Sequence, residues 1–360
     1  MNVPSSTRPA EGLAPPPARR ITVELTNICN LHCGYCVRDD DDLHHSPGKF
    51  FPADLMRKVL RGARAAYGPT YVSFTGGEVT LHPRFGDIID AVIAEGMEFG
   101  FVTNGWHFDR VYEALLRRPE SVRVVAFSLD GATREAHDRW RGEGSFVRVV
   151  RAMARCHASG IKFALKVGIR RDTAQHLQEF ALFAARLGAS TLQFAHLLPT
   201  SPGVEAESAL TPFERREAEE EVMLLANIFK MPVRLVPGYY NIDPAPPCDA
   251  LDGTTCNVDF RGRLSLCCNL SGYRGAAGEP DVVGDLTSEE FSTAYERLLR
   301  VREEQNERRR RALADAAGAG REPDLYVGSP CLFCLVSFGK VPWRPVAGAA
   351  RSLPVLPAGV

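Results

Sequence analysis

Three cysteines near the N-terminus stand in the order Cys-x₃-Cys-x₂-Cys, at Cys29, Cys33 and Cys36. Closely spaced thiolates bind metal, and three are one short of the four that the irons of a [4Fe–4S] cluster require. A cluster held in this way keeps one iron open to a small molecule, as a catalytic zinc site keeps an open position. The alternative is that the three cysteines form part of a zinc site, because cysteines that bind zinc often come in pairs with a second pair further along the chain.

A second candidate segment, Gly76-Gly77-Glu78, comes directly after Tyr71–Thr75, which we expect to be a strand. Two glycines at a strand end allow the backbone to approach a ligand closely. The carboxylate of Glu78 can accept hydrogen bonds from an ammonium group. Taken alone, the segment fits a tight turn with a solvated glutamate equally well.

Together, the cysteine triplet and the Gly-Gly-Glu segment resemble the radical S-adenosylmethionine (SAM) superfamily. The resemblance implies that Cys29, Cys33 and Cys36 hold a [4Fe–4S] cluster and that the amino and carboxylate groups of SAM fill its open iron. It implies that the reduced cluster cleaves SAM to a 5′-deoxyadenosyl radical, which abstracts a substrate hydrogen. It also assigns the SAM amino group to Glu78 and its two preceding glycines.

The same resemblance implies further SAM contacts near the ends of strands. Tyr35 stands where the family has an aromatic residue that packs near the adenine, and Ser128 opens a Ser-Leu-Asp-Gly segment whose serine reaches polar atoms of SAM. Asn104 follows another expected strand, and Arg141 is expected to hold the SAM carboxylate. A helix cap, a turn or a surface ion pair is the alternative for each residue. The competing cations for the SAM carboxylate are Lys166 and Arg170.

These residues need elements that bring strand ends together. Short β-rich runs alternate with amphipathic stretches, which predicts an α/β fold with a parallel sheet and helices outside it. In such folds chemistry occurs at the carboxyl ends of the strands, where the triplet and Gly-Gly-Glu fall. The periodicity alone is compatible with both a doubly wound sheet and a barrel. The superfamily resemblance implies an open (βα)₆ partial TIM barrel. The expected strands are 21–26, 71–75, 99–103, 122–129, 162–169 and 191–198, and the expected helices are 52–66, 85–95, 108–117, 134–139, 146–159, 174–187 and 211–229. We expect the last of these helices to begin with a capping box, because Thr211 is followed by a proline and, three residues on, by Glu214.

A second group of cysteines follows in the C-terminal part of the chain. Cys248, Gly262 and Cys267, an expected hairpin of 255–260 against 263–267, and a later Cys-x₂-Cys pair resemble the SPASM/twitch extensions of radical SAM enzymes. The segment 335–360 contains no cysteine, so the resemblance implies one auxiliary [4Fe–4S] cluster instead of two. Five plausible ligands compete for four places: Cys248, Cys256, Cys267, Cys331 and Cys334.

Alternatives remain within this group. Cys256 either binds the cluster or points inward from a hairpin strand. Cys268 should face away from Cys267, because neighbours along a strand alternate. Cys156 lies in an expected helix and should belong to the core. A structural zinc site with four cysteines is the competing interpretation of the whole group.

The composition narrows the class of protein. Lys plus Arg number 43 and Asp plus Glu 44, which argues against nucleic acid or a membrane surface as the main partner. We expect the run Arg308–Arg311 to be a solvated helix face. No segment approaches the ~18 apolar residues of a membrane span, and the N-terminus lacks a signal peptide. We therefore expect a cytoplasmic protein whose ten cysteines serve metal or redox chemistry.

We expect four parts of the chain: a disordered segment 1–19, a radical SAM core 20–232, a SPASM/twitch-like auxiliary iron–sulfur domain 233–345 and a loose tail 346–360. The resemblance favours oxidative modification of a peptide or protein. The alternative is a twitch-type enzyme that dehydrogenates a small hydroxylated metabolite, such as an aminocyclitol or sugar. A remote alternative is a non-catalytic protein that binds SAM or a metal. The expected partners are an electron donor such as flavodoxin or ferredoxin and, because few residues precede the first strand, a separate leader-peptide-binding protein.

Overall fold

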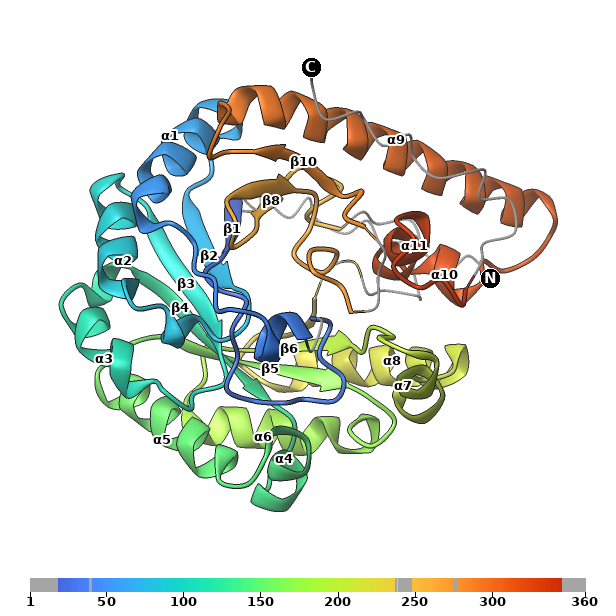
Figure 1. Ribbon diagram of the computed structural model, residues 1–360. Coiled ribbons are helices and arrows are strands. Elements are labelled where there is room, and N and C mark those ends of the chain that lie inside the picture. Colours follow the sequence, from blue (N-terminus) through green and yellow to red (C-terminus); the bar gives the residue numbers. More distant parts are fainter. Residues whose placement is uncertain (1–18, 39–40, 237, 239–247, 275–277, 345–360) are drawn as a thin grey trace, which may run out of the picture.

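The computed structural model describes residues 19–38, 41–236, 238, 248–274 and 278–344. A curved sheet of parallel strands lies at its centre, and each strand pairs with the next one along the chain. Figure 1 shows the helices outside the arc that these strands form. In chain order the parallel strands are β1 (Arg20–Glu24), β2 (Tyr71–Thr75), β3 (Glu98–Thr103), β4 (Val122–Leu129), β5 (Phe163–Ile169), β6 (Thr191–His196) and β7 (Val233–Leu235).

The core lies between the outer face of the sheet and the helices. In β2, Val72 and Phe74 are fully buried while the residues between them are half-buried, and β6 alternates in the same way. The larger apolar side chains therefore pack against helices, and smaller or polar side chains face the inside of the barrel. The helices of this layer are α1 (Met56–Tyr67), α2 (Phe85–Ala94), α3 (Asp109–Leu116), α4 (Arg134–Arg141), α5 (Ser145–Ala158), α6 (Leu177–Leu187), α7 (Pro202–Ser208) and α8 (Pro212–Ile228).

The C-terminal part of the chain continues the same sheet. The expected hairpin forms from β8 (Thr255–Val258) and β9 (Arg263–Ser265), and β10 (Val282–Asp285) pairs with β9. Strand β8 also pairs in parallel with β1, so the described part of the sheet has the order β10-β9-β8-β1-β2-β3-β4-β5-β6-β7. The long helix α9 (Phe291–Gly318) runs along this side of the molecule, followed by α10 (Leu325–Gly328) and α11 (Pro330–Ser337) (Figure 1).

The predicted elements are confirmed, and the capping box predicted at Thr211 forms with Glu214. Six elements were not predicted with their bounds: α7, β7, β10, α9, α10 and α11. Of these, β7 has only three residues and so offers no pattern to read, and within α9 only the run Arg308–Arg311 was expected to be helical. Strand β7 begins at residue 233, the first residue of the predicted auxiliary domain, yet it pairs with β6 of the predicted core. The sheet therefore crosses the predicted boundary. Of the predicted terminal segments, 346–360 and all of 1–19 except Arg19 lie outside the described residues.

The arginine run on α9 is only partly a solvated face. Arg310 and Arg311 are exposed and pair with Glu307, as predicted. Arg309 is buried and donates a hydrogen bond to the carbonyl oxygen of Gly328 at 2.9 Å, so the prediction is wrong for this residue. Its guanidinium joins α9 to the end of α10.

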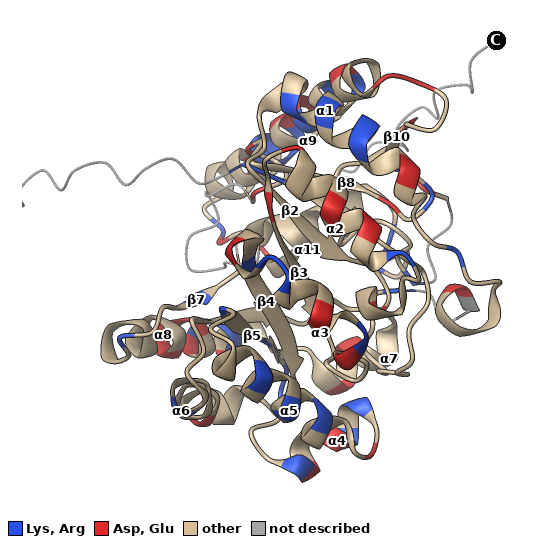
Figure 2. Ribbon diagram, turned by 90° about the vertical axis from the view of Figure 1, so that its left-hand side faces the viewer, with Lys and Arg blue, Asp and Glu red and all other residues tan. Residues whose placement is uncertain are grey.

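Charges of both signs are distributed over the outer helices. In the view of Figure 2, α2 carries only acidic residues and α5 only basic ones, so the two signs are spread over different helices. Among the residues that the structure describes, no helix combines the length and the apolar character needed to cross a membrane.

Candidate active site

The N-terminal cysteines lie in the loop that follows β1. The backbone N–H of Cys36 donates to the carbonyl oxygen of Cys33 at 2.9 Å, and all three thiols are half-buried. Burial raises the pKa of Cys29 to about 12 and also raises that of Cys33, against the opposing influence of the Arg141 guanidinium. Thiols of this kind become thiolates when a bound metal supplies the compensating charge, so they suit a metal cluster.

The two glycines after β2 are required by the backbone of the same loop. A Cβ atom on Gly76, whose φ is +127°, would lie 2.5 Å from the carbonyl oxygen of Thr26, and one on Gly77 would lie 2.0 Å from that of Ile28. The backbone N–H groups of Gly77 and Glu78 donate to these two oxygens at 2.8 and 2.7 Å. We expected the glycines to approach a ligand. The structure shows that they let the end of β2 pack against the chain that leads into the cysteine loop, and their approach to SAM remains a prediction.

The carboxylate of Glu78 is buried and held by four donors. Its Oε1 accepts from the backbone and hydroxyl of Thr80 at 3.1 and 2.7 Å and from the hydroxyl of Thr103 at 2.7 Å. Its Oε2 accepts from the backbone N–H of Asn104 at 2.8 Å. Because a carboxylate has about four acceptor sites, two on each oxygen, the remaining capacity is on Oε2. The predicted contact of Glu78 with the SAM amino group remains a prediction, and Oε2 is the atom available for it.

Asn104 connects β3 to the cysteine loop. Its side-chain amide donates to Oδ1 of Asn30 at 3.1 Å and accepts from the backbone N–H of Trp106 at 2.9 Å. Both ends of the amide are therefore used inside the protein. This contact holds the segment between Cys29 and Cys33 against the barrel.

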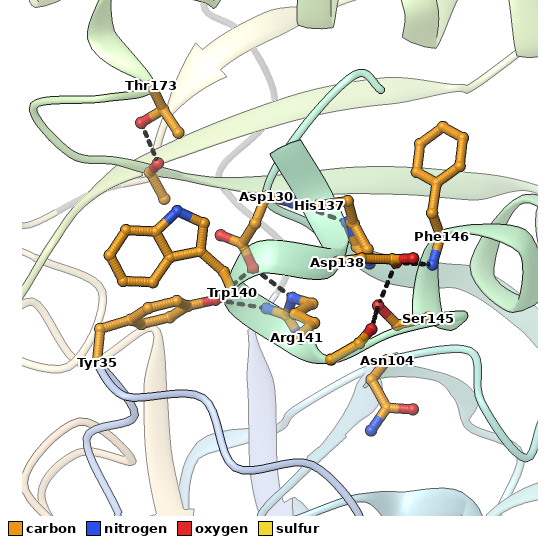
Figure 3. Close-up of polar contacts among 12 residues, drawn as sticks. Tyr35, Asn104, Asp130, His137, Asp138, Trp140, Arg141, Ser145, Phe146 and Thr173 are labelled. Atoms are coloured by element: carbon orange, nitrogen blue, oxygen red, sulfur yellow. Dashed lines mark hydrogen bonds and ion pairs between the residues drawn. The ribbon is translucent and has the colours of Figure 1, made fainter. Parts of the chain in front are cut away.

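A buried carboxylate at the end of β4 organises the next part of the site (Figure 3). Asp130 accepts hydrogen bonds from the hydroxyl of Tyr35, from Nε of Arg141 and, at 2.5 Å, from Nη1 of Arg170. Burial acts to raise the pKa of Asp130, but the guanidiniums of Arg141 and Arg170 outweigh it and hold this pKa well below its usual range. The guanidinium of Arg170 also lies over the ring of Trp140, 4.3 Å from its centroid.

This network changes the outlook for the predicted SAM contacts. Arg141 lines a cavity inside the barrel but pairs with Asp130, so a SAM carboxylate would share its guanidinium. The side chain of Arg170 is 0% exposed and is not part of the described lining of that cavity. Tyr35 lines the cavity, and its hydroxyl is fixed by Asp130 and Arg141. Asp130 is the residue that sequence reasoning missed, although the Ser-Leu-Asp-Gly segment contains it.

Four of the C-terminal cysteines come together beside this cavity. A Cβ atom on Gly238 would lie 2.8 Å from both Cβ of Cys248 and Sγ of Cys331. Burial and the proximity of Cys248 and Cys334 raise the pKa of Cys331. Cys267 is also within electrostatic range of Cys248 and Cys331. Thus Cys248, Cys267, Cys331 and Cys334 share one site although they come from separate segments.

N–H groups point at the sulfurs of this group. The backbone N–H of Asn269 donates to Sγ of Cys267 at 3.4 Å, and Nε2 of the buried Gln305 donates to Sγ of Cys334 at 3.5 Å. Hydrogen bonds to sulfur are one of the means by which proteins stabilise iron–sulfur clusters. Within the described ranges, no three His, Cys, Asp or Glu side chains converge on a point where one metal ion would fit. Each thiolate of a [4Fe–4S] cluster binds a different iron.

The structure separates Cys256 from the other candidate ligands. Its thiol is fully buried and lies 3.2 Å from the hydroxyl of Tyr67 on α1. Burial raises its pKa to about 11, and the neighbours that affect it are Tyr67 and Arg302, not another cysteine. Because Cys256 belongs to β8, its position in the strand directs the sulfur toward the helix layer. Of the five candidates, Cys256 is therefore the one whose sulfur lies apart from the other cysteines.

Cys268 departs from its prediction. Strand β9 ends at Ser265, so the alternation expected of strand neighbours does not reach Cys267 and Cys268. Their thiols are hydrogen-bonded to each other and both line the cavity. Cys156 is buried in the core, as predicted.

Two loops that carry cysteines are joined directly, in what we call the loop junction (34–38 with 271–274). Arg38 forms an antiparallel bridge with Tyr273, and the backbone N–H of Arg274 donates to the carbonyl oxygen of Val37 at 2.7 Å. The guanidinium of Arg38 donates to the carbonyl oxygen of Ser271 and pairs with Glu24 at 2.9 Å. The segment after Cys267 is thereby fixed to the segment after Cys36.

A cavity of about 280 Å³ lies beside the C-terminal cysteines, and Tyr35 of the first cysteine loop also lines it. It is formed by the inner face of the sheet, by the cysteine loop after β1 and by the C-terminal cysteines. Its lining includes Arg20, Tyr35, Ser128, Arg141, Lys166, Gln193 and Cys268.

A partial barrel of parallel strands with a cysteine triplet after its first strand and Gly-Gly-Glu after its second defines the class of SAM-binding radical enzymes. Residues 23–184 match the model of the Radical SAM superfamily. Over 261 residues the chain is 32% identical to the mycofactocin maturase MftC of Mycobacterium ulcerans, which covers 69% of this chain and 67% of the relative. The chain belongs to the radical SAM superfamily, whose members use a [4Fe–4S] cluster and SAM.

Other relatives agree. The mycofactocin maturase MftC of Mycobacterium tuberculosis (strain H37Rv) is 32% identical over 263 residues, 69% of this chain and 63% of the relative. The AdoMet-dependent heme synthase of Oleidesulfovibrio alaskensis is 25% identical over 206 residues, 56% of this chain and 51% of the relative. The matched part thus spans about two thirds or less of the length of these curated relatives.

Two solved structures share the fold. Streptococcus suis SuiB, bound to its precursor peptide SuiA, superposes with a TM-score of 0.63 at 14% identity and covers 77% of this chain and 64% of its own. The protein anSMEcpe with bound AdoMet superposes with a TM-score of 0.61 at 16% identity, over 78% of this chain and 80% of its own. At these identities the likeness concerns the fold, and the predicted open barrel is confirmed.

Proposed function

We propose that this protein is a radical SAM enzyme that oxidatively modifies a peptide. The observation that carries the proposal is the cavity inside the barrel, because its wall includes C-terminal cysteines together with Tyr35 of the loop that carries the N-terminal cysteines. The similarity to mycofactocin maturases, and the fold shared with a protein solved with its precursor peptide, favour a peptide over a small metabolite.

The residues around the first site have separate tasks. In the proposed enzyme, Cys29, Cys33 and Cys36 hold the cluster, while Gly76 and Gly77 let β2 support their loop. The reduced cluster and SAM supply a 5′-deoxyadenosyl radical that removes a hydrogen atom from the substrate.

Residues at the strand ends position SAM in this proposal. Oε2 of Glu78 accepts from its amino group, and Ser128 contacts its polar atoms. Asp130 keeps Tyr35 and Arg141 at fixed places on the cavity wall, near the adenine and the carboxylate respectively.

The second site holds one auxiliary [4Fe–4S] cluster in this proposal, bound by Cys248, Cys267, Cys331 and Cys334. The grouping of these thiols around Gly238 and the N–H groups directed at their sulfurs support the assignment. The domain that carries it is proposed to span 233–345, with its sheet continuous with the radical SAM core. Zinc in place of iron at this site would contradict the assignment.

The electron donor is proposed to be a flavodoxin or ferredoxin, and the leader of a precursor peptide is proposed to be bound by a separate protein. We also propose a cytoplasmic location, where thiols remain reduced.

The first experiment measures 5′-deoxyadenosine after anaerobic reconstitution with iron and sulfide, SAM and dithionite. We expect formation by the wild-type protein and none above background by Cys33→Ala. Peptides encoded beside the gene are then added, and the expected product has lost the mass of hydrogen atoms. Equal 5′-deoxyadenosine formation by both proteins would overturn the proposal.

A further inference from the structure

A row of polar side chains crosses the inner face of the sheet. Ser128 of β4 lies in register with Lys166 of β5, Lys166 with Gln193 of β6, and Gln193 with Arg234 of β7. Residues in register on neighbouring parallel strands point to the same face of a sheet. Ser128, Lys166 and Gln193 all line the cavity. Adjacent strands thus present a hydroxyl, an ammonium and an amide to the same space.

Lys166 differs from the other basic residues of the cavity in lacking a carboxylate partner. Nη2 of Arg20 lies 2.7 Å from Asp249, and Arg141 pairs with Asp130. Lys166 makes no hydrogen bond or ion pair with any residue of the described ranges. The cavity therefore contains one cation whose charge is not matched by a carboxylate from that part of the chain.

The surroundings of Lys166 favour the arrival of an anion. Burial lowers the pKa of Lys166, and the guanidiniums of Arg20 and Arg234 lower it further, while the thiol of Cys268 opposes them. An ammonium that has lost water without gaining a carboxylate is unfavourable. A carboxylate that enters the cavity relieves this by pairing with Lys166.

The position of Lys166 places such an anion beside SAM. In the proposed enzyme Ser128 contacts SAM, and Lys166 is its neighbour in register on the next strand. Gln193 follows on the far side of Lys166 and offers an amide N–H to the same group. A carboxylate held between Lys166 and Gln193 would therefore lie next to Ser128 on the neighbouring strand.

We propose that Lys166 and Gln193 form a binding site for a carboxylate of the substrate. The inference rests on the proposed function and specifies its substrate: a peptide that presents either its C-terminal carboxylate or an Asp or Glu side chain inside the barrel. Lys166 supplies the charge, and Gln193 fixes the orientation by a hydrogen bond.

The test measures binding of small probes to the reconstituted, oxidised full-length protein with SAM, by saturation-transfer NMR. N-acetyl-dialanine and its C-terminal amide represent the chain terminus. N-acetylglutamate α-amide and N-acetylglutamine amide represent the side chain. We expect the wild-type protein to prefer at least one acid over its amide. The preferred acid should bind Lys166→Met roughly tenfold or more weakly, as the loss of a charge-assisted contact implies.

Three comparisons keep the test decisive. Lys166→Arg should retain most of the preference, and Lys162→Met, which changes an exposed lysine just before β5, should behave as wild type. Wild-type protein that binds neither acid better than its amide, including no binding of either, would overturn the proposal, as would unchanged acid binding by Lys166→Met. A parallel loss of SAM affinity in Lys166→Met would assign Lys166 to SAM instead. The binding assay involves no SAM cleavage. Failure of the protein to form 5′-deoxyadenosine would therefore contradict the proposed function without changing the result of the binding test.

Discussion

The two cysteine groups reach their sites in different ways. Cys29, Cys33 and Cys36 belong to one short loop after β1, and their relative positions are set mainly by local chain geometry. The second group combines a cysteine before β8, one after β9 and two on α11, and two of its four members, Cys248 and Cys334, are buried. The first site is thus a property of a segment, whereas the second exists only when the C-terminal part of the chain has folded.

This difference teaches how each site should fail. A change in the first loop should remove its cluster and leave the rest of the fold intact. A change at the second site should reach further, because the loop junction connects the segment after Cys267 to the segment after Cys36. The predictions below test this asymmetry.

The largest effect is expected from Cys33→Ala, which should abolish reductive cleavage of SAM because a three-thiolate site loses one ligand. The triple variant Cys29→Ala/Cys33→Ala/Cys36→Ala should retain about four irons per chain at the second site. Iron analysis and 5′-deoxyadenosine formation measure the two outcomes. Cys156→Ala, which changes a buried cysteine of the core, is the control and should keep both clusters. A triple variant that contains no iron would show that the two sites do not assemble independently.

A matched pair of substitutions tests the composition of the second site. Cys248→Ala should lose about four irons, because it removes a ligand. Cys256→Ala should keep the iron and lose only the contact between its sulfur and Tyr67. Iron content and the charge-transfer absorption of the clusters report the result. Loss of iron from Cys256→Ala together with its retention in Cys248→Ala would reverse the assignment.

Gly77→Ala should damage the first site without touching a cysteine. The added Cβ atom would lie 2.0 Å from the carbonyl oxygen of Ile28, so the loop must move. We expect loss of SAM binding, measured by equilibrium dialysis, and a weakened first cluster. Gly86→Ala on α2 is the control, since its Cβ atom would meet only a side-chain atom of Arg117 at 3.5 Å and alanine favours a helix. Normal SAM affinity in Gly77→Ala would argue against the role of this packing.

Glu24 links the two regions and predicts a pH dependence. It pairs with Arg38 of the first loop at 2.9 Å and accepts from Asn257 of β8 at 2.8 Å. Burial raises the pKa of Glu24 to about 7, despite the opposing effect of Arg38. Its protonation therefore stabilises the fold below the ordinary glutamate pKa, and this contribution is lost as the pH rises toward 7.

Urea unfolding at several pH values measures this effect. The free energy of unfolding of the wild-type protein should fall between about pH 4.5 and 7 by an amount on the order of a few kcal/mol relative to Glu24→Gln. Parallel pH profiles for the two proteins would show that Glu24 does not titrate in this range.

The smallest effect is expected at Gln305, which donates to Sγ of Cys334 at 3.5 Å. Gln305→Leu removes this hydrogen bond and should lower the reduction potential of the auxiliary cluster by an amount on the order of tens of millivolts. Redox titration followed by EPR measures the shift. Asn306→Ala is the control, because Asn306 donates to the carbonyl oxygen of Leu251 instead of a sulfur. Equal shifts in both variants would attribute the effect to α9 and not to the sulfur contact.

Much of the barrel was predictable because its signals are local. The strands 71–75 and 122–129 were predicted with their observed bounds, and the capping box at Thr211 was read from four residues. Strand β7 was missed because three residues form a strand only when β6 offers a partner. Only the run Arg308–Arg311 of helix α9 was expected to be helical, because much of the helix is a charged sequence whose buried positions depend on α1, β10 and α11.

The same distinction holds for the site. The cysteine triplet and Gly-Gly-Glu were recognisable from spacing, but the reason for the glycines was not, because Ile28 and Gly77 meet only in three dimensions. The choice among five C-terminal cysteines depended on which face of β8 carries the sulfur of Cys256. The role of Asp130 depended on Arg141 and Arg170 converging on it from different elements.

The loop junction also has a consequence for how the protein is made. Arg38 and Ser271, which meet there, are separated by 233 positions in the chain. At a synthesis rate of roughly 5–20 residues per second, the first loop spends about 10–50 s outside the ribosome before its partner exists. During this interval residues 37 and 38 lack the contacts with 271–274 that fix them in the folded protein. A cluster inserted on the growing chain would therefore sit in a loop whose C-terminal end is not yet held.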